Sequence, residues 1–147
     1  MSQSVVIEEA VVADGELVAA IRRLLPLLSS SAPPVEAFDV ETLVNAPATQ
    51  LLVARVDGQI VGTLTLAIFR IPSGVRAWIE DVIVDEEARG HGVGAALCTE
   101  AIRRAGLANA RTVDLTSNPK REAANAMYRK LGFVARETNV YRFSLES

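Results

Sequence analysis

A glycine-rich segment, Arg89-Gly90-His91-Gly92-Val93-Gly94, constrains what this chain can fold into more than any other stretch. Residues 75–84 before it read as a strand. Apolar residues after it recur at helical spacing, at Leu97, Cys98, Ala101, Ile102 and Ala105. The first N–H groups of a helix have no intrahelical partner, and glycine lets an anion approach them closely. The segment therefore predicts an anion-binding turn between a strand and a helix, to which Arg89 can add a charged contact.

Three interpretations of this turn compete. The plainest is a turn that only links strand to helix. A second is a dinucleotide fingerprint, Gly90-x-Gly92-x-x-Ala95, with Asp114 as the acidic residue about 20 positions later. That fingerprint needs several parallel strands, but antiparallel hairpins are predicted before the turn and too few residues follow it. A P-loop is excluded because no Gly-Lys-Ser/Thr ending is present. The third interpretation is a pyrophosphate-binding loop with the pattern Arg89-x-x-Gly92-x-Gly94. Its support comes from the motifs described below.

The first half of the chain predicts a strand, two helices and an antiparallel meander. Residues 5–9 favour a strand, and Asp14 is placed to cap a helix whose apolar side chains run from Leu17 to Leu28. Pro26 falls inside this pattern and should kink the helix or end it early. A loop, a short helix, a hairpin around Asp57-Gly58 and a third strand follow, at residues 29–34, 38–44, 50–71 and 75–84.

The glycine segment begins a crossover. The helix that follows it ends near Gly106, and residues 111–116 predict the next strand. A strand, helix, strand unit crosses over right-handedly and makes its two strands parallel. The sequence therefore predicts a mixed α+β fold.

The last part of the chain predicts one more helix and a hairpin. Ala124, Met127, Tyr128 and Leu131 mark one face of the helix, which Gly132 ends. Residues 133–136 and 140–144 are expected to close the sheet as a final hairpin. Without a linker or an internal repeat, we expect a single domain over residues 1–147.

Composition excludes several classes of function. The chain has 147 residues and a formal net charge of −3, so no global positive field favours nucleic acid or an anionic membrane as a partner. Cys98 is the only cysteine, which excludes a disulfide framework and a cysteine-based metal cluster, and no metal is expected. No secretory signal is evident, and the longest apolar stretch, residues 60–69, is far short of the roughly 20 residues of a membrane helix. We expect a cytoplasmic protein.

Two motifs resemble those of the GNAT superfamily of acyl-CoA-dependent N-acetyltransferases. The first is Ile79-Glu80-Asp81-Val82-Ile83-Val84, continued by the glycine segment and Ala95-Ala96-Leu97. The second is Ala124-Asn125-Ala126-Met127-Tyr128-Arg129-Lys130-Leu131-Gly132-Phe133. Their order and separation are those of the family, and the resemblance is strongest over residues 76–134. It implies a GNAT-like fold, a mostly antiparallel twisted sheet with a central splayed pair of parallel strands flanked by helices.

The resemblance implies acetyl-CoA as the co-substrate. The main chain of Val82, Ile83 and Val84 would pair with the pantetheine arm. Next to Arg89, the backbone amides of Gly90, His91, Gly92, Val93, Gly94 and Ala95 would hold the pyrophosphate. The family often has an asparagine seven residues before the tyrosine, where it contacts the coenzyme, and this chain has Arg121 there. Asn118 and Asn125 are the candidates to replace that contact.

Acetyl transfer to an amine requires a proton acceptor, because an alkyl amine with a pKa of about 10 is only about one part in a thousand neutral at pH 7. Glu80, Asp81 or a water can take that proton. In a regular strand the side chains of Glu80 and Asp81 lie on opposite faces of the sheet. One of them should therefore point into the cleft where the acetyl group is transferred. The resemblance places Tyr128 beside the sulfur, where its hydroxyl can protonate the leaving thiolate.

We therefore expect an N-acetyltransferase that moves the acetyl group of acetyl-CoA to a primary amine by direct attack in a ternary complex. The amine belongs to a small molecule, an amino acid or a peptide, and no motif identifies it further. The alternative is a noncatalytic acyl-CoA-binding or sensing domain, because a fold and a coenzyme loop do not prove turnover. The resemblance is also compatible with a homodimer.

Overall fold

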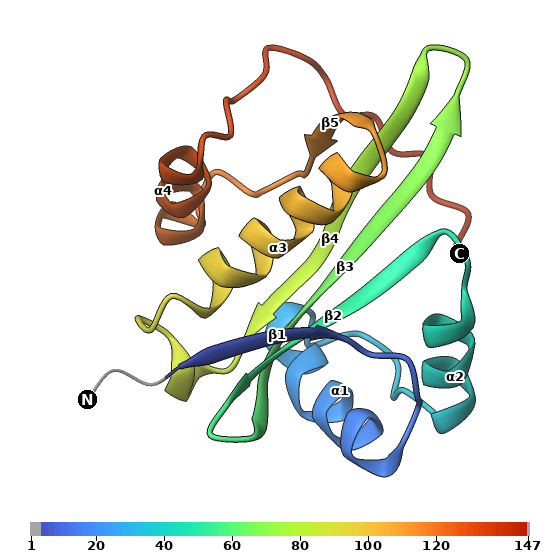
Figure 1. Cartoon of the computed structure of the whole chain (residues 1–147), viewed down its shortest axis with the longest axis vertical. Helices are drawn as coiled ribbons and strands as arrows, with labels where there is room; N and C mark the ends of the chain where they lie inside the picture. The colour runs from blue at the N-terminus through green and yellow to red at the C-terminus, as the bar shows by residue number, and fades with distance from the viewer. Residues whose placement is uncertain (1–3, 147) are drawn as a thin grey trace. The chain divides into compact units, whose positions relative to one another are not determined.

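The computed structural model describes residues 4–146, and Figure 1 labels the strands and helices found there. The chain forms two compact units, residues 1–116 and residues 117–147. The first unit holds a five-stranded sheet and three α-helices, and the second holds one α-helix. Within residues 4–146, none of the helices combines the length and the hydropathy needed to cross a membrane.

The sheet of the first unit follows the order of the chain. Its strands are β1 (Val5–Glu9), β2 (Thr49–Val56), β3 (Gln59–Ile71), β4 (Gly74–Val84) and β5 (Ala110–Asp114), and they lie side by side in that order. All neighbours are antiparallel except β4 and β5, which are parallel. The predicted meander and crossover are therefore confirmed. Asp57 and Gly58 turn β2 into β3 with φ of 52° and 79°, the left-handed pair that a two-residue hairpin turn needs.

Helices α1 (Gly15–Leu28) and α2 (Ala37–Asn45) pack on one face of the sheet. The carboxylate of Asp14 caps α1 by accepting a hydrogen bond from the backbone N–H of Leu17 at 2.9 Å. The core on this face consists of Leu17, Val18, Ala20, Leu24, Val40, Leu51, Val53, Ile60 and Ile83. Pro26 does not end α1 early, because the helix runs to Leu28. The hydrogen bond that the proline removes lies in the last turn of the helix.

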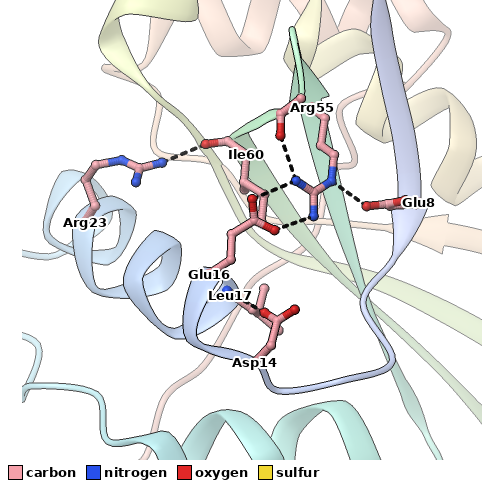
Figure 2. A network of polar contacts seen from close by, with 8 residues as sticks. Glu8, Asp14, Glu16, Leu17, Arg23, Arg55 and Ile60 are labelled. Carbon is pink, nitrogen blue, oxygen red and sulfur yellow. Dashed lines mark hydrogen bonds and ion pairs between the residues drawn. The ribbon is translucent and has the colours of Figure 1, made fainter.

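A polar network around Arg55 holds α1 to the strands (Figure 2). The Arg55 guanidinium donates to Glu8 of β1 at 2.6 Å and to both carboxylate oxygens of Glu16 of α1 at 3.0 and 2.7 Å. It also donates to the Gly58 carbonyl at 2.8 Å. The hydrogen bond from Arg55 lowers the pKa of Glu16, and the carboxylates raise the pKa of Arg55. One side chain therefore links β1, α1 and the β2–β3 turn.

Helix α3 (Val93–Leu107) crosses from β4 to β5 on the other face of the sheet. A side chain at position 62 of β3 would meet Val93 and Leu97 of α3, and alternate strand residues share a face. Leu64 and Leu66 therefore face α3 as well, and both are fully buried. The buried α3 residues are Val93, Leu97, Cys98, Ala101 and Ala105. Ile102, which the sequence placed on that face, is 38% exposed because it lies about 100° around the helix from Ala101.

The second unit contains α4 (Glu122–Leu131), which ends at Gly132 with a φ of 106°, as a glycine C-cap does.

The expected final hairpin at residues 133–136 and 140–144 is wrong, because residues 133–146 contain no strand. Val140, Tyr141 and Phe143 are 72%, 87% and 87% exposed. Alternating apolar residues form a strand only where a neighbour supplies backbone partners and a buried face. Among the described residues the parallel pair consequently lies at the edge of the sheet, with β5 outermost, and not at its centre.

Candidate functional site

A bulge in β4 interrupts the strand where the sequence places the catalytic carboxylates. The β3–β4 register pairs Glu80 with Thr65 and Ile83 with Thr63, so two β4 residues stand opposite Leu64 alone. Asp81 is one of them, and its φ of 50° lies in the left-handed region. Aspartate is among the few residues other than glycine that adopt this conformation readily. Bulges re-aim side chains, often beside active sites.

The bulge removes the regular alternation that we expected between Glu80 and Asp81. Paired residues lie on one face of a sheet, so the register puts Glu80, Thr65, Thr63 and Ile83 on the same face. Asp81 reaches this face too, because it lines a pocket together with the two threonines and Ile83. Glu80 is exposed and does not line that pocket. The structure thus brings Asp81, and not Glu80, to the pocket wall.

This pocket lies between α1, α2 and the sheet and has a volume of about 230 Å³. The helices and the segment before α2 contribute mainly apolar walls, namely Ile21, Leu25, Val35, Val40 and Leu43. The strands contribute Leu51, Thr63, Thr65, Asp81 and Ile83. A second carboxylate, Asp39 of α2, completes the lining. Asp39 and Asp81 are exposed, whereas Val40, Leu51 and Ile83 are buried, so the charges lie at the mouth of an apolar pocket.

The parallel strands β4 and β5 separate beside the bulge. Their pairing ends at Trp78 and Asp114. Asp114 accepts a hydrogen bond from Arg76 of β4 at 3.1 Å, so this contact lies at the paired end of the two strands. Beyond this point, among the described residues, β4 has a neighbour only on its β3 side. The main chain of Val82, Ile83 and Val84 therefore lies along an edge without a second strand.

The glycine segment follows directly and opens α3. Gly90 and Gly92 have φ of 85° and 77°, and a Cβ added at either would meet no atom within 4 Å. Backbone conformation, and not crowding, therefore requires glycine here, and the space beside this main chain is open. The first helical hydrogen bond joins Ala96 N to Gly92 O at 3.0 Å, which leaves the amides of the first three helical residues, 93–95, without intrahelical partners.

Arg89 precedes Gly90, His91 lies between Gly90 and Gly92, and both side chains are exposed. Within residues 4–146, the Arg89 guanidinium makes no hydrogen bond or ion pair, so its charge is available at the loop. Among the described residues, the His91 side chain likewise makes no hydrogen bond or ion pair. Cys98 is fully buried in α3, and burial raises the pKa of its thiol to about 11; this agrees with the interpretation of Cys98 as a core residue.

The remaining predicted residues belong to the second unit. Tyr128 of α4 is 6% exposed, and its ring meets that of Phe133 edge-on, with the centroids 5.8 Å apart. The Asn118 carboxamide oxygen accepts from the backbone N–H of Lys120 at 2.9 Å. The Asn125 carboxamide donates to the Asn118 carbonyl at 3.0 Å. Both asparagines therefore organise the start of α4.

Sequence reasoning missed Asp39 and Thr63 of the pocket. The structure has Asp39 in the first turn of α2, where its carboxylate accepts from the backbone N–H of Glu36 at 3.0 Å. This capping pattern at the start of α2 is the one local feature of the sequence that could have drawn attention to Asp39. Among residues 4–146, no group of three or more histidine, cysteine, aspartate or glutamate side chains is placed to hold a metal ion.

The sequence model of the acetyltransferase (GNAT) family matches residues 11–133. The chain therefore belongs to the GNAT family of acetyltransferases.

Solved structures with the same fold agree with this assignment. A putative acetyltransferase from Agrobacterium tumefaciens is 25% identical, with a TM-score of 0.83 over 95% of this chain and 99% of that one. A ribosomal-protein-alanine N-acetyltransferase from Brucella melitensis is 23% identical, with a TM-score of 0.77 over 96% and 100% of the two chains. The enzyme AAC(6')-Iy, in complex with the bisubstrate analogue CoA-S-monomethyl-acetylneamine, is 18% identical, with a TM-score of 0.80 over 96% and 98%. The last two likenesses concern the fold alone.

Proposed function

We propose that this protein transfers the acetyl group of acetyl-CoA to a primary amine by direct attack in a ternary complex. The observation that carries the proposal is the continuity of three features in one stretch of chain. Within residues 4–146, a strand whose second edge has no neighbour is followed by glycines in left-handed conformations and then by a helix whose first amides have no intrahelical partner. A CoA-containing bisubstrate analogue in AAC(6')-Iy, which shares the fold, gives further support.

The loop is suited to a pyrophosphate. The open space at Gly90 and Gly92 lets phosphate oxygens reach the main chain, and the amides of residues 93–95 can donate to them. Arg89 supplies a full positive charge, so a chain of net charge −3 can still bind a highly charged anion locally. The free edge of β4 at Val82, Ile83 and Val84 is suited to the amide groups of a pantetheine arm.

The reaction needs two proton transfers that side chains of this chain can perform. The amine nitrogen attacks the thioester carbonyl carbon, a C–N bond forms, and the C–S bond breaks to release the thiolate of CoA. Glu80 or Asp81, directly or through a water, takes the proton that the amine loses. We assign Tyr128 as the acid that protonates the thiolate, on the family motif around it.

The decisive experiment measures release of free thiol from acetyl-CoA with a panel of primary amines, together with direct binding of CoA by calorimetry. We expect amine-dependent release and CoA binding that weakens when Arg89 is replaced by alanine. CoA binding without release across the panel would favour the noncatalytic acyl-CoA-binding domain instead. A protein that binds no CoA would contradict both.

The base is identified by pH–rate profiles of Glu80→Gln and Asp81→Asn. The essential carboxylate is the one whose removal abolishes the acidic limb of the profile. A Glu80→Gln enzyme with the profile of the wild type excludes Glu80 as the base.

We also propose that both units act as one domain over residues 1–147, because the family match, residues 11–133, extends from the first unit into the second. A single cooperative unfolding transition, seen by both fluorescence and circular dichroism, is then expected.

A further inference from the structure

We propose that the pocket between α1, α2 and the sheet is the acceptor site, and that its substrate is a primary amine on a compact hydrocarbon body without a carboxylate. This inference rests on the proposed function, and it assigns the substrate class that the sequence left open. It also gives Asp39 and Thr63 a role in selecting the acceptor.

The size and lining of the pocket determine the size and polarity of the part of the acceptor that binds inside it. An apolar cavity of about 150 Å³ holds benzene, so a pocket of about 230 Å³ accommodates roughly nine or ten non-hydrogen atoms. Ile21, Leu25, Leu43 and Leu51 present only hydrocarbon to such a ligand. A polyhydroxylated amine would lose its hydrogen bonds to water against these side chains without replacement. A hydrocarbon body is stabilised there by the same burial that holds the core.

The charges at the mouth set the polar end of the acceptor. Asp39 and Asp81 are the two charged side chains that line the pocket, and both are acidic. Arg22 lies beside it on α1, but its guanidinium donates to the Val35 carbonyl at 2.8 Å and pairs with Glu36 at 3.7 Å. An ammonium group is therefore attracted to the mouth, and a carboxylate is repelled. This charge pattern discriminates an amine from the corresponding α-amino acid.

The hydroxyl of Thr63 offers a polar contact inside the pocket. Thr63 is 5% exposed and lines the pocket. Within residues 4–146, its side chain makes no hydrogen bond. Its Oγ1 is not among the fully buried, unpartnered side-chain atoms of the described residues, so it is reachable from the pocket, and a ligand nitrogen can form a hydrogen bond with it. The adjoining bulge at Asp81 belongs to the β4 segment whose other edge we assign to the pantetheine arm, so an amine bound here lies beside the reacting strand.

The first test uses the unmodified protein and four ligands. Binding of 2-phenylethylamine, phenylalanine, 2-phenylethanol and glucosamine is measured by calorimetry, with and without CoA. We expect 2-phenylethylamine to bind at least about tenfold more tightly than each of the others, because it alone has the ammonium, the hydrocarbon and no carboxylate. Equal or tighter binding of phenylalanine or glucosamine would overturn the inference.

The second test removes one pocket group at a time. Asp39→Asn keeps an oxygen that can still cap α2, and Thr63→Val is isosteric. We expect each to weaken 2-phenylethylamine binding by about three- to tenfold while CoA binding is unchanged. Glu41→Gln is the matched control, because Glu41 is exposed on α2 and does not line the pocket. The inference is wrong if Asp39→Asn and Thr63→Val both bind the amine as Glu41→Gln does.

Failure of this inference is distinguishable from failure of the proposed function. If thiol release occurs with polar amines or amino acids and is the same in Asp39→Asn as in the wild type, the substrate class is wrong and the transferase activity stands. If 2-phenylethylamine binds in an Asp39-dependent manner but CoA does not bind, the pocket is supported and the transferase activity is not.

Discussion

Gly62 of β3 and Val93 at the first turn of α3 approach so closely that a Cβ added at Gly62 would lie 3.0 Å from Cγ1 of Val93. The same Cβ would lie 3.0 Å from the carbonyl oxygen of Ile83, which cannot move without bending β4. Gly62 therefore sets how deeply the start of α3 sits on the sheet. The amides that we assign to the pyrophosphate begin at that turn.

Gly62→Val should push the start of α3 away from the sheet. We expect a loss of about 1–3 kcal/mol in the free energy of unfolding, typical of overpacking, and weaker CoA binding in the protein that remains folded. Urea unfolding and calorimetry measure the two effects. Gly106→Ala is the control on the same helix, where a Cβ meets no atom within 4 Å; it should be neutral or slightly stabilising. Equal behaviour of the two variants would contradict the role of Gly62.

Two substitutions of Gly92 distinguish the effect of backbone strain on stability from the effect of a side chain on phosphate binding. Its φ of 77° is costly for alanine and tolerated by asparagine, while the space for a Cβ is open. We expect Gly92→Ala to lose about 1 kcal/mol or more of stability and Gly92→Asn to lose less. Both side chains obstruct the approach of a phosphate, so both variants should bind CoA more weakly than the wild type. If Gly92→Asn binds CoA as tightly as the wild type, the loop does not contact the pyrophosphate.

The sequence was sufficient to predict the local structure wherever residues close in the chain determine the backbone conformation. The Asp57-Gly58 turn, the Asp14 cap and the glycine that ends α4 all act within a few residues, and each is found as predicted. The prediction of a final hairpin was wrong because the alternating apolar residues at 140–144 indicate only that this segment could form a strand. They do not show which strand it would pair with.

The pocket could not be predicted for a related reason. The left-handed φ of Asp81 is compatible with its residue type, but nothing in the sequence requires it. The opposite faces that a regular strand predicts for Glu80 and Asp81 are therefore not found, although one of the two, Asp81, does line the pocket. Asp39 and Asp81 are 42 positions apart in the sequence and come to one pocket only through the packing of α2 on the sheet. A motif can point to residues that are close along the chain, whereas residues gathered by tertiary packing leave no such pattern in the sequence.

Tyr128→Phe tests the proposed acid. We expect turnover to fall by about 10²- to 10⁴-fold, as for removal of a general acid, with CoA affinity nearly unchanged. The Phe side chain keeps the ring and therefore the edge-on contact with Phe133 at 5.8 Å, so only the interaction of the hydroxyl is lost, and stability should fall by about 0.5–1.5 kcal/mol. Phe133→Leu is the control that removes the ring contact and keeps the hydroxyl. Near-normal turnover of Tyr128→Phe would remove its role as the acid.

Glu100 makes part of the stability of α3 depend on pH. Its carboxylate accepts hydrogen bonds from Arg103 at 2.7 and 2.8 Å and from Arg104 at 2.7 Å, and these lower the pKa of Glu100 from 4.5 to about 2. Because the folded pKa lies below the unfolded one, this stabilisation is complete above about pH 4.5 and is lost as the pH falls towards 2.

Glu100→Gln should therefore cost about 0.5–1 kcal/mol at pH 7, as expected for a partly exposed ion-pair network. The difference from the wild type should shrink as the pH is lowered from 5 and disappear near pH 2. Urea unfolding at several pH values measures this, with Glu41→Gln as an exposed control that lacks an ion-pair partner within residues 4–146. A difference that stays constant between pH 5 and pH 2 would show that Glu100 acts through packing and not through its charge.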